Sequence, residues 1–333
     1  ASVVTANKAV LATHLRELSA LAAAHGVDLF YEAAVAGAIP VVRTLRTSLA
    51  GQRVDRVLGI VNGTTNFLLT TMTRERRDYG DVLGEAIELG YAEQDPTADV
   101  QGHDAAQKAA ILASLAFGVE VTEADVPREG IAKVTVADLE AAARMGHVVR
   151  LLTVAERVGD DAVTVRVQPT MLPASHPLAA VDGASNAVFV EGVALGELML
   201  QGRGAGGPPT STAVLGDLVA AARNRRATTT EPSPPMAERA VLLEPGEVRS
   251  AFYLAIEVAD RPGVLAAVAQ VFGHHDVSIR SMEQIGLGDD ARLVFLTHGA
   301  STAAMSSTVA ALRDLDAVTD VGALLHVIDG ADA

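Results

Sequence analysis

The chain has 333 residues, enough for two or three domains, each with its own core. Its formal net charge of −15 argues against a nucleic-acid partner, and cysteine is absent, which excludes disulfides and thiolate chemistry. No run of about twenty apolar residues is long enough to span a membrane. The first residues lack the basic start and apolar core of a secretory signal. We therefore expect a cytoplasmic protein that binds neither nucleic acid nor membrane.

Helices and strands alternate through the first 200 residues. Helical spacing predicts a helix over 7–24, with leucines on one stripe, and further helices over 81–90 and 104–117. Residues 27–33 and 54–61 are typical of short strands, and 162–172 alternates like a half-buried strand. Residues 62–67 predict a turn that becomes a helix, capped by Thr64 or Thr65. This order indicates an α/β or α+β architecture.

The second half of the chain begins with a glycine-rich loop and ends in a self-contained pattern. Residues 198–226 indicate a strand end, the loop, and a helix that starts near Thr210. Proline, threonine and glutamate dominate 227–247, which predicts an extended linker. The next segments are predicted in the ferredoxin-like order βαββαβ: strand 252–259, helix 262–274, strands 277–286 and 291–298, helix 302–314 and strand 320–328. His274 and His275 are expected to end a helix.

An acidic loop followed by a lone lysine is the most unusual stretch. It reads "YAEQDPTADVQGHDAAQKAAIL" from Tyr91 to Leu112. Asp104 can cap the helix, and Lys108, four residues later, lies on the same face. The stripe continues through apolar residues, so the lysine should emerge from packed surface, where it can give a proton to a developing alkoxide.

The residues alone leave other interpretations of this stretch open. A capped helix start with an ordinary i,i+4 ion pair would look the same. Acidic loops also bind divalent metals, and "DPTADVQGHD" is a candidate of low specificity for such a metal-dependent site.

Longer blocks resemble a known family. "GYAEQDPTADVQGHDAAQKAAIL" is similar to the central motif of homoserine dehydrogenases. "VVTANKAVLA" (3–12), "YEAAVAGAIPVV" (31–42) and "GIVNGTTNFLLTTM" (59–72) resemble three further blocks, in the family's order. The tail "LAIEVADRPGVLAAVAQVFGHHDVSI" (254–279) resembles an ACT regulatory domain. The whole chain resembles the monofunctional, ACT-bearing type.

One departure from the family's pattern concerns the start of the chain. The family opens with a nucleotide-binding βαβ unit that carries a glycine-rich fingerprint, and none opens this sequence. We expect that roughly the first hundred residues are missing and that this chain alone binds NAD(P) poorly and lacks activity. A non-catalytic amino-acid-binding or assembly module is the alternative to a dehydrogenase.

The resemblance implies a division into five segments. Residues 1–33 would be the remnant of a Rossmann-type nucleotide-binding domain, and 34–200 an α+β substrate, catalytic and dimerisation domain. Residues 201–226 would return to the nucleotide-binding domain, 227–248 would be a linker, and 249–330 a ferredoxin-like ACT domain that is separable and moves as a unit.

The resemblance also implies roles for single residues. Lys108 would donate a proton to the substrate oxygen, Asp99 would lie close to that oxygen, and Lys8 would sit beside the nicotinamide. The substrate's amino group would be held by Glu93 and Asp104, in a pocket lined by Tyr91, Gly63 and Thr64. Gly206 would contact the cofactor, NADP or NAD, at the start of a helix, where bare amides suit an anion.

Further ligands follow from the same resemblance. Backbone oxygens at Glu32, Val35, Gly37 and Ile39 would surround Na⁺ or another monovalent cation. The substrate would be L-homoserine or L-aspartate 4-semialdehyde, and L-threonine a possible effector. In "ADRPGVL" (259–265), Asp260 would meet the effector's ammonium group, and open amides at Gly263 its carboxylate. The protein would be a homodimer or homotetramer.

Overall fold

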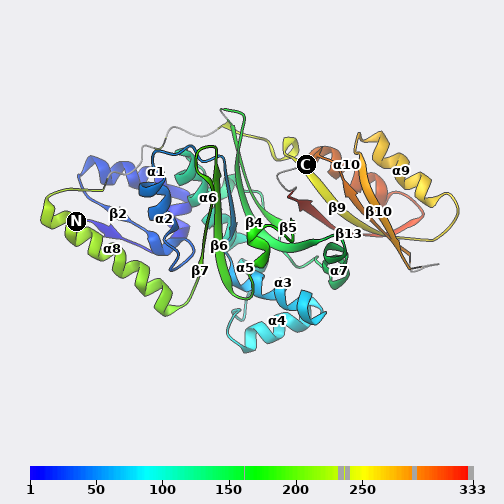
Figure 1. Cartoon of the computed structure of the whole chain (residues 1–333), viewed down its shortest axis with the longest axis horizontal. Helices are drawn as coiled ribbons and strands as arrows, with labels where there is room; N and C mark the ends of the chain where they lie inside the picture. Colours follow the sequence, from blue (N-terminus) through cyan, green and yellow to red (C-terminus); the bar gives the residue numbers. More distant parts are fainter. Residues whose placement is uncertain (161, 232–235, 237–240, 287–290, 329–333) are drawn as a thin grey trace.

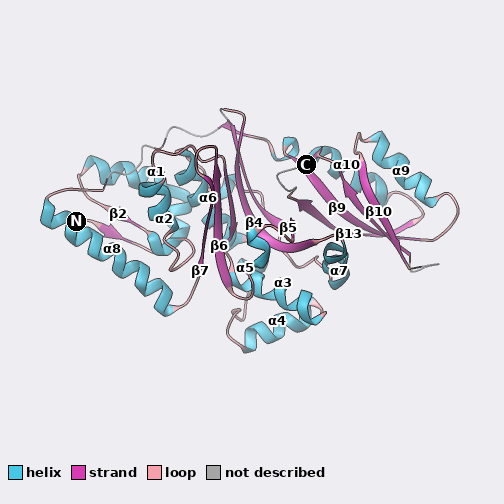
Figure 2. Cartoon of the chain, in the orientation of Figure 1, coloured by secondary structure: helices cyan, strands magenta, loops and turns pink. Residues whose placement is uncertain are grey.

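One mixed sheet runs through most of the molecule (Figures 1 and 2). The computed structural model describes residues 1–333 except 161, 232–235, 237–240, 287–290 and 329–333. In spatial order, the described strands of the sheet are β10 (Ile279–Ile285), β11 (Ala291–Thr297), β9 (Arg249–Val258), β13 (Val318–Val327), β5 (Ala162–Pro173), β4 (His147–Val158), β3 (Arg56–Ile60), β6 (Ser185–Gly192) and β7 (Gly196–Arg203). Two short strands pair beside this path, β8 (Val241–Leu242) with β5 and β12 (Ala300–Ser301) with β9. Separately, β1 (Val3–Val4) pairs in parallel with β2 (Leu29–Phe30).

Helices surround this sheet on both halves of the molecule. They are α1 (Lys8–Ala24), α2 (Val41–Arg43), α3 (Gly63–Glu75), α4 (Tyr79–Glu88), α5 (Thr97–Val100), α6 (His103–Phe117), α7 (Val136–Arg144), α8 (Gly207–Ala227), α9 (Val264–His274) and α10 (Thr302–Arg313). The short 3-10 turns are η1 (Glu32–Ala34), η3 (Glu123–Asp125), η4 (Pro177–Ala180) and η5 (Pro245–Glu247), and α2 continues as a π-helix, η2 (Thr44–Ser48). No helix among the described residues is both long and apolar enough to cross a membrane.

Helix α6 is the central helix of the larger half. It begins after Gly102 and ends at Gly118, both with positive φ, a conformation that glycine adopts without strain. Six of its 15 residues are alanines, which let it pack closely against α1, β4 and β5, so that even Lys108 is buried. The helix therefore presents its few polar side chains at fixed positions.

The two long strands β4 and β5 pair along their whole lengths. β5 alternates in sequence, but the prediction that it is half-buried is wrong: its residues from Val163 to Leu172 are all buried. Its apolar side chains belong to the core beside α6, and its polar side chains are covered as well.

Helix α8 brings a late segment back to the start of the chain. It lies beside the N-terminal elements at one end of the molecule (Figure 1) and contacts β1 and η1. Asn224 and the Glu231 amide both donate to the Asp28 carboxylate, at 3.1 and 2.8 Å. Residues from the end of α8 and beyond are thus hydrogen-bonded to the N-terminal segment at this end of the molecule.

The C-terminal segment has the predicted ferredoxin-like order. Its strands lie in the order β10–β11–β9–β13, that is, second, third, first and fourth along the chain, with α9 and α10 packed together. His274 ends α9, as predicted. The described part of 227–247 is not simply an extended linker, because Val241 and Leu242 pair with β5; residues 232–235 and 237–240 lie outside the described residues.

This C-terminal domain shares a core with the rest of the molecule. β13 pairs in parallel with β5 at His326 and Val327. One face of its sheet forms a cluster with α9 and α10, while Tyr253, Leu325 and Val327 from the other face belong to the main core. A shared apolar interface restrains domain motion. The C-terminal domain is therefore packed against the larger half of the molecule, and its movement as a unit on the linker stays a prediction.

Several local predictions need correction. Asn62, rather than Thr64 or Thr65, caps α3, because its side-chain oxygen accepts the Thr65 amide at 2.9 Å. Gly102 precedes α6, so Asp104 lies in the first turn and does not cap the helix. Helix α8 starts at Gly207 rather than near Thr210, and the strand predicted over 27–33 is only Leu29–Phe30, followed by η1.

Candidate active site

Five polar residues meet where β3 ends and where α1, α3 and α6 begin. We call Lys8, Asn62, Asp99, Asp104 and Lys108 the lysine cluster. Lys8 is the first residue of α1, and Asn62 stands between β3 and α3. Asp99 lies in α5, while Asp104 and Lys108 share one face of α6. Segments far apart in the chain thus place their charges together.

Lys108 is held in one orientation. Only 9% of its surface is exposed, and its Nζ donates to the Val61 carbonyl and to Asp104 Oδ2, each at 2.7 Å. An ammonium group has three N–H bonds. Two are used by the protein, and the third is left for an oxygen atom of a ligand.

Asp104 is the anion that the two lysines share. Its Oδ1 lies 3.0 Å from Lys8 Nζ, and its Oδ2 also accepts from Asn62 Nδ2 at 2.9 Å. Burial alone would raise the pKa of Asp104, but Lys108 and Lys8 outweigh it and lower that pKa to about 2. Asp104 therefore stays ionised across the physiological range and keeps both cations in place.

Asp99 is oriented by the start of α3. Asn62 Nδ2 donates to its Oδ1 at 2.7 Å, and Thr64 Oγ1 lies 3.2 Å from its Oδ2. Thr64 Oγ1 is also 2.7 Å from the Tyr91 carbonyl, and its single proton serves one of these acceptors at a time. The arrangement fixes the Asp99 carboxylate beside the lysines.

Asn62, which bridges the two carboxylates of the cluster, was not predicted from the sequence. It caps α3 with its oxygen and reaches both carboxylates with its nitrogen, and it is buried. Its position directly after a strand and before a glycine could have indicated a functional residue. Residues 62–67 were instead interpreted as a turn that becomes a helix. The Val61 carbonyl was missed too, because a backbone group has no sequence signature.

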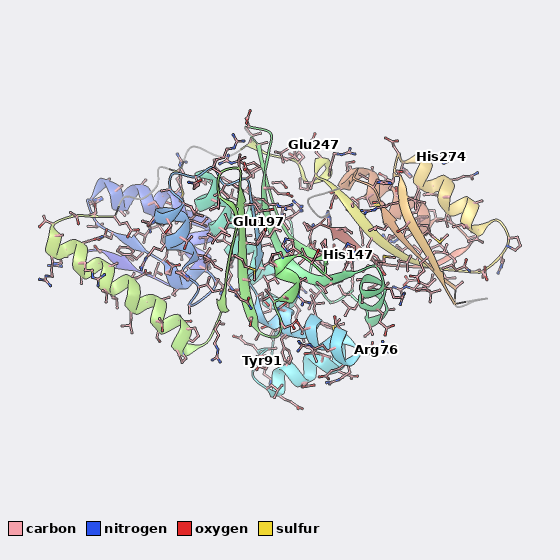
Figure 3. The ribbon with its side chains drawn as sticks, in the orientation of Figure 1. Arg76, Tyr91, His147, Glu197, Glu247 and His274 are labelled. Carbon is pink, nitrogen blue, oxygen red and sulfur yellow. The ribbon has the colours of Figure 1, made fainter. Side chains whose placement is uncertain are left out.

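The remaining predicted substrate residues lie at different distances from the cluster. Gly63 packs so tightly that a Cβ there would lie 2.7 Å from the Ala184 carbonyl oxygen. Tyr91 is 47% exposed, stacks on Phe67 at 4.6 Å and lies at the lower edge of the molecule in Figure 3. Glu93 is exposed and has no hydrogen bond to a described residue, so the structure does not bring it into the cluster.

The predicted cofactor glycine lies in the loop between β7 and α8. Gly206 has φ 110° and precedes α8, and no hydrogen bond between described residues joins it to Lys8. The neighbouring Gly204 packs against the turn after η1, where a Cβ on Gly37 would lie 2.5 Å from the Gly204 oxygen. The glycine-rich loop and the predicted cation turn are therefore in contact.

That cation turn can offer only main-chain oxygens. The Glu32 carboxylate accepts the amides of Val42 and Arg43, each at 2.9 Å, and burial raises its pKa to about 7. Val35 and Ile39 are apolar and buried. Among the described residues, no group of three or more His, Cys, Asp or Glu side chains is arranged to hold a metal, so a divalent metal in the acidic loop finds no support.

The fold and the site define a mixed α/β enzyme class with an appended regulatory domain. A family model described as "Homoserine dehydrogenase" matches residues 40–219, and one described as "ACT domain" matches 252–317. The chain belongs to the homoserine dehydrogenase family of oxidoreductases and carries a C-terminal ACT domain.

Individual relatives agree with this assignment. The homoserine dehydrogenase of Mycobacterium tuberculosis is 52% identical over 336 residues, covering 98% of this chain and 76% of the relative. The crystal structure of a homoserine dehydrogenase from Thiobacillus denitrificans superimposes with a TM-score of 0.93 at 37% identity, covering 98% of this chain and 76% of that one. A hyperthermophilic archaeal homoserine dehydrogenase in complex with NADPH has a TM-score of 0.59 at 33% identity, covering 67% of this chain and 64% of that one.

Proposed function

We propose that this chain interconverts L-homoserine and L-aspartate 4-semialdehyde at the lysine cluster, with NADP or NAD as cofactor. The observation that carries the proposal is the buried Lys108 ammonium group, which has two hydrogen-bond acceptors among the described residues and so keeps a third N–H for a ligand. When bound, the nicotinamide supplies or accepts the hydride. Lys108 then supplies the proton that the aldehyde oxygen needs as negative charge develops on it.

Asp104 and Asp99 have supporting roles in this scheme. The Asp104 carboxylate, with its pKa of about 2, stays charged and stabilises the Lys108 ammonium group. Asp99, fixed by Asn62, is placed to orient Lys108 or a water molecule. In the reverse direction, Lys108 as the neutral amine would accept the alcohol proton.

We assign the substrate's amino group to Glu93 and Asp104, in a pocket with Tyr91, Gly63 and Thr64. Among the described residues, Asp104 Oδ1 has Lys8 as its single partner and so retains an acceptor position. Glu93 is exposed and would have to turn inward when substrate binds. A Glu93→Gln variant should raise KM for homoserine, and an unchanged KM would remove Glu93 from the pocket.

We assign Lys8 and Gly206 to the cofactor. Lys8 is tied to the cluster through Asp104, which supports a position beside the reacting carbon. Gly206 precedes α8, where the Gly207 amide can meet an anionic group, whereas Pro208 and Pro209 carry no N–H. The NADPH-bound archaeal relative supports a nicotinamide dinucleotide. Calorimetry with NADPH and NADH tests both the binding and the preference.

We further propose a monovalent cation at the carbonyls of Glu32, Val35, Gly37 and Ile39, and L-threonine as the effector at Asp260 and Gly263. Gly263 has φ 93° and precedes α9, as a ligand-accessible helix start requires. Replacing Na⁺ by a large organic cation should lower activity. An Asp260→Asn variant should weaken inhibition by L-threonine. We expect a homodimer or homotetramer, to be checked by light scattering.

A Lys108→Met variant tests the central proposal. It keeps the length and packing of the side chain but removes the proton, which should lower kcat with L-aspartate 4-semialdehyde by a factor of about 100 to 10,000. Gln107→Met is the matched control on the same helix, since Gln107 bonds Glu123 at 3.1 Å instead. A Lys108→Met enzyme within a few-fold of wild type, with an unchanged circular dichroism spectrum, would contradict the assignment.

A further inference from the structure

A cavity of about 900 Å³ lies at the junction of the central sheet and the C-terminal domain. Its wall is the edge of β5 between the pairings with β8 at Ala162 and Val163 and with β13 at Thr170 and Met171. Arg128 bridges this edge at Val167. The loop 124–133 covers one side and residues 242–248 the other. Glu247, labelled in Figure 3, marks the short η5 turn at the upper end of this junction.

The side chains on this wall are polar although they are buried. Arg166 and Gln168 are two apart on β5 and so face the same side of the sheet. His326 pairs with Thr170 on the neighbouring strand and joins them. The exposed fractions of Arg166, Gln168 and His326 are only 6%, 8% and 8%, and all three line the cavity.

These groups lack the partners that buried polar atoms need. Arg166 Nε, Gln168 Nε2 and His326 Nδ1 have no hydrogen-bond partner among the described residues. Arg166 Nη1 forms an ion pair with Glu156 at 2.5 Å, but neither Nη1 nor Nε has a hydrogen-bond partner among the described residues. The guanidinium and amide nitrogens are donors only, and neutral histidine can place its proton on Nδ1. The residues that line the cavity thus carry donors without acceptors among the described residues.

We propose that this junction cavity binds a small molecule through its carboxylate group, which accepts from Arg166 and Gln168. A carboxylate offers paired acceptors in the geometry that a guanidinium edge and an amide can reach. A doubly charged phosphate fits less well, since Glu156 already balances Arg166 and the carboxylates of Glu129 and Glu244 also line the cavity. Those two carboxylates can also meet an ammonium group, so α-amino acids belong to the ligand class.

The cavity is adjacent to the lysine cluster through one short segment. Gln101 and His103 line the cavity. Both lie in the segment between Asp99 and Asp104, the two carboxylates of the lysine cluster. A bound ligand would therefore press on the segment that positions both carboxylates. The cavity is separate from the α9 start, where the effector residues Asp260 and Gly263 were assigned.

The test is calorimetric titration of the chain with three probes: L-threonine, propionate and inorganic phosphate. We expect both carboxylates to bind and phosphate not to bind. Gln168→Met, which removes a donor, and Arg166→Lys, which keeps the charge but loses Nε, should each weaken the binding about tenfold or more. The exposed Gln201→Met is the matched control and should change nothing.

Further variants separate this site from the others. Asp260→Asn and Lys108→Met should leave the affinity for propionate unchanged, so the result does not depend on turnover, on the effector site or on the proposed dehydrogenase site. Ligand-free Gln168→Met should melt no lower than wild type, because an unpartnered buried amide is replaced by an apolar side chain. Absence of binding by both carboxylates, binding by phosphate alone, or unchanged affinity in Gln168→Met and Arg166→Lys would each overturn the proposal.

Discussion

Asp104 shows how a single carboxylate can be both buried and strongly acidic. Desolvation opposes its charge, yet two lysines and Asn62 surround it at 2.7 to 3.0 Å. Its pKa falls from 3.8 to about 2 on folding. A depressed pKa stabilises the folded state above the unfolded pKa, and this stabilisation is lost as the pH falls through the folded pKa.

An Asp104→Asn variant should therefore be less stable at pH 7 by about 2 kcal/mol, from about 1.4 kcal/mol per pKa unit. The difference from wild type should shrink as the pH falls from about 4 to about 2. Urea unfolding at several pH values measures it. Asp316→Asn, an exposed aspartate without an ion pair to a described residue, is the control. A difference that does not depend on pH would contradict the linkage.

Among the elements, α7 makes the most specific polar contact between the two halves of the molecule. Asp138 in its first turn is fully buried and closes a capping box with Thr135. Its Oδ1 accepts the Tyr253 hydroxyl of β9 at 2.9 Å and pairs with Arg292 of β11 at 2.5 Å. One helix start is thus tied to two strands of the C-terminal domain.

A Tyr253→Phe variant should lower the free energy of unfolding by about 1 to 2 kcal/mol, because a buried carboxylate loses one donor while Arg292 and Thr135 remain. Thermal and urea unfolding measure the loss. Tyr79→Phe is a matched control, since the Tyr79 hydroxyl has no hydrogen bond to a described residue, and should stay within about 0.5 kcal/mol. Equal effects of the two substitutions would show that the Asp138 contact contributes nothing.

For the whole molecule, the shared sheet and core predict cooperative unfolding. β13 joins β5 through one short parallel pairing, and the Ile328 amide donates to the Met171 carbonyl at 2.9 Å. The Ile328 side chain packs in a cluster with Leu172 and Leu152 of the central sheet. The C-terminal domain thus contributes to the stability of the catalytic half (Figure 2).

Wild type should show a single calorimetric transition, and Ile328→Pro should split it in two, because proline removes the amide donor at the joint. The control is Thr319→Ala on the exposed start of β13, which should leave one transition. A proline at Val193 would not serve as a control, because the Val193 amide donates to Asp55. Two transitions already present in wild type would contradict the shared core.

The local elements and the family could be predicted from the amino-acid sequence alone. Periodicity located α1, α6 and the βαββαβ order of 249–330 to within a few residues, because helix and strand spacing is set by neighbours along the chain. The i,i+4 relation placed Asp104 beside Lys108 for the same reason, and the long motifs carried the resemblance to homoserine dehydrogenases.

Contacts between side chains that are far apart in the sequence became known only from the tertiary structure. The sequence could not tell that Lys8 would share Asp104 with Lys108, that Asn62 would bridge two carboxylates, or that Glu93 would lie apart. It also could not tell that β13 would extend the central sheet and enclose the polar edge of β5. Such contacts depend on how the chain closes over long separations, and no local spacing encodes that closure.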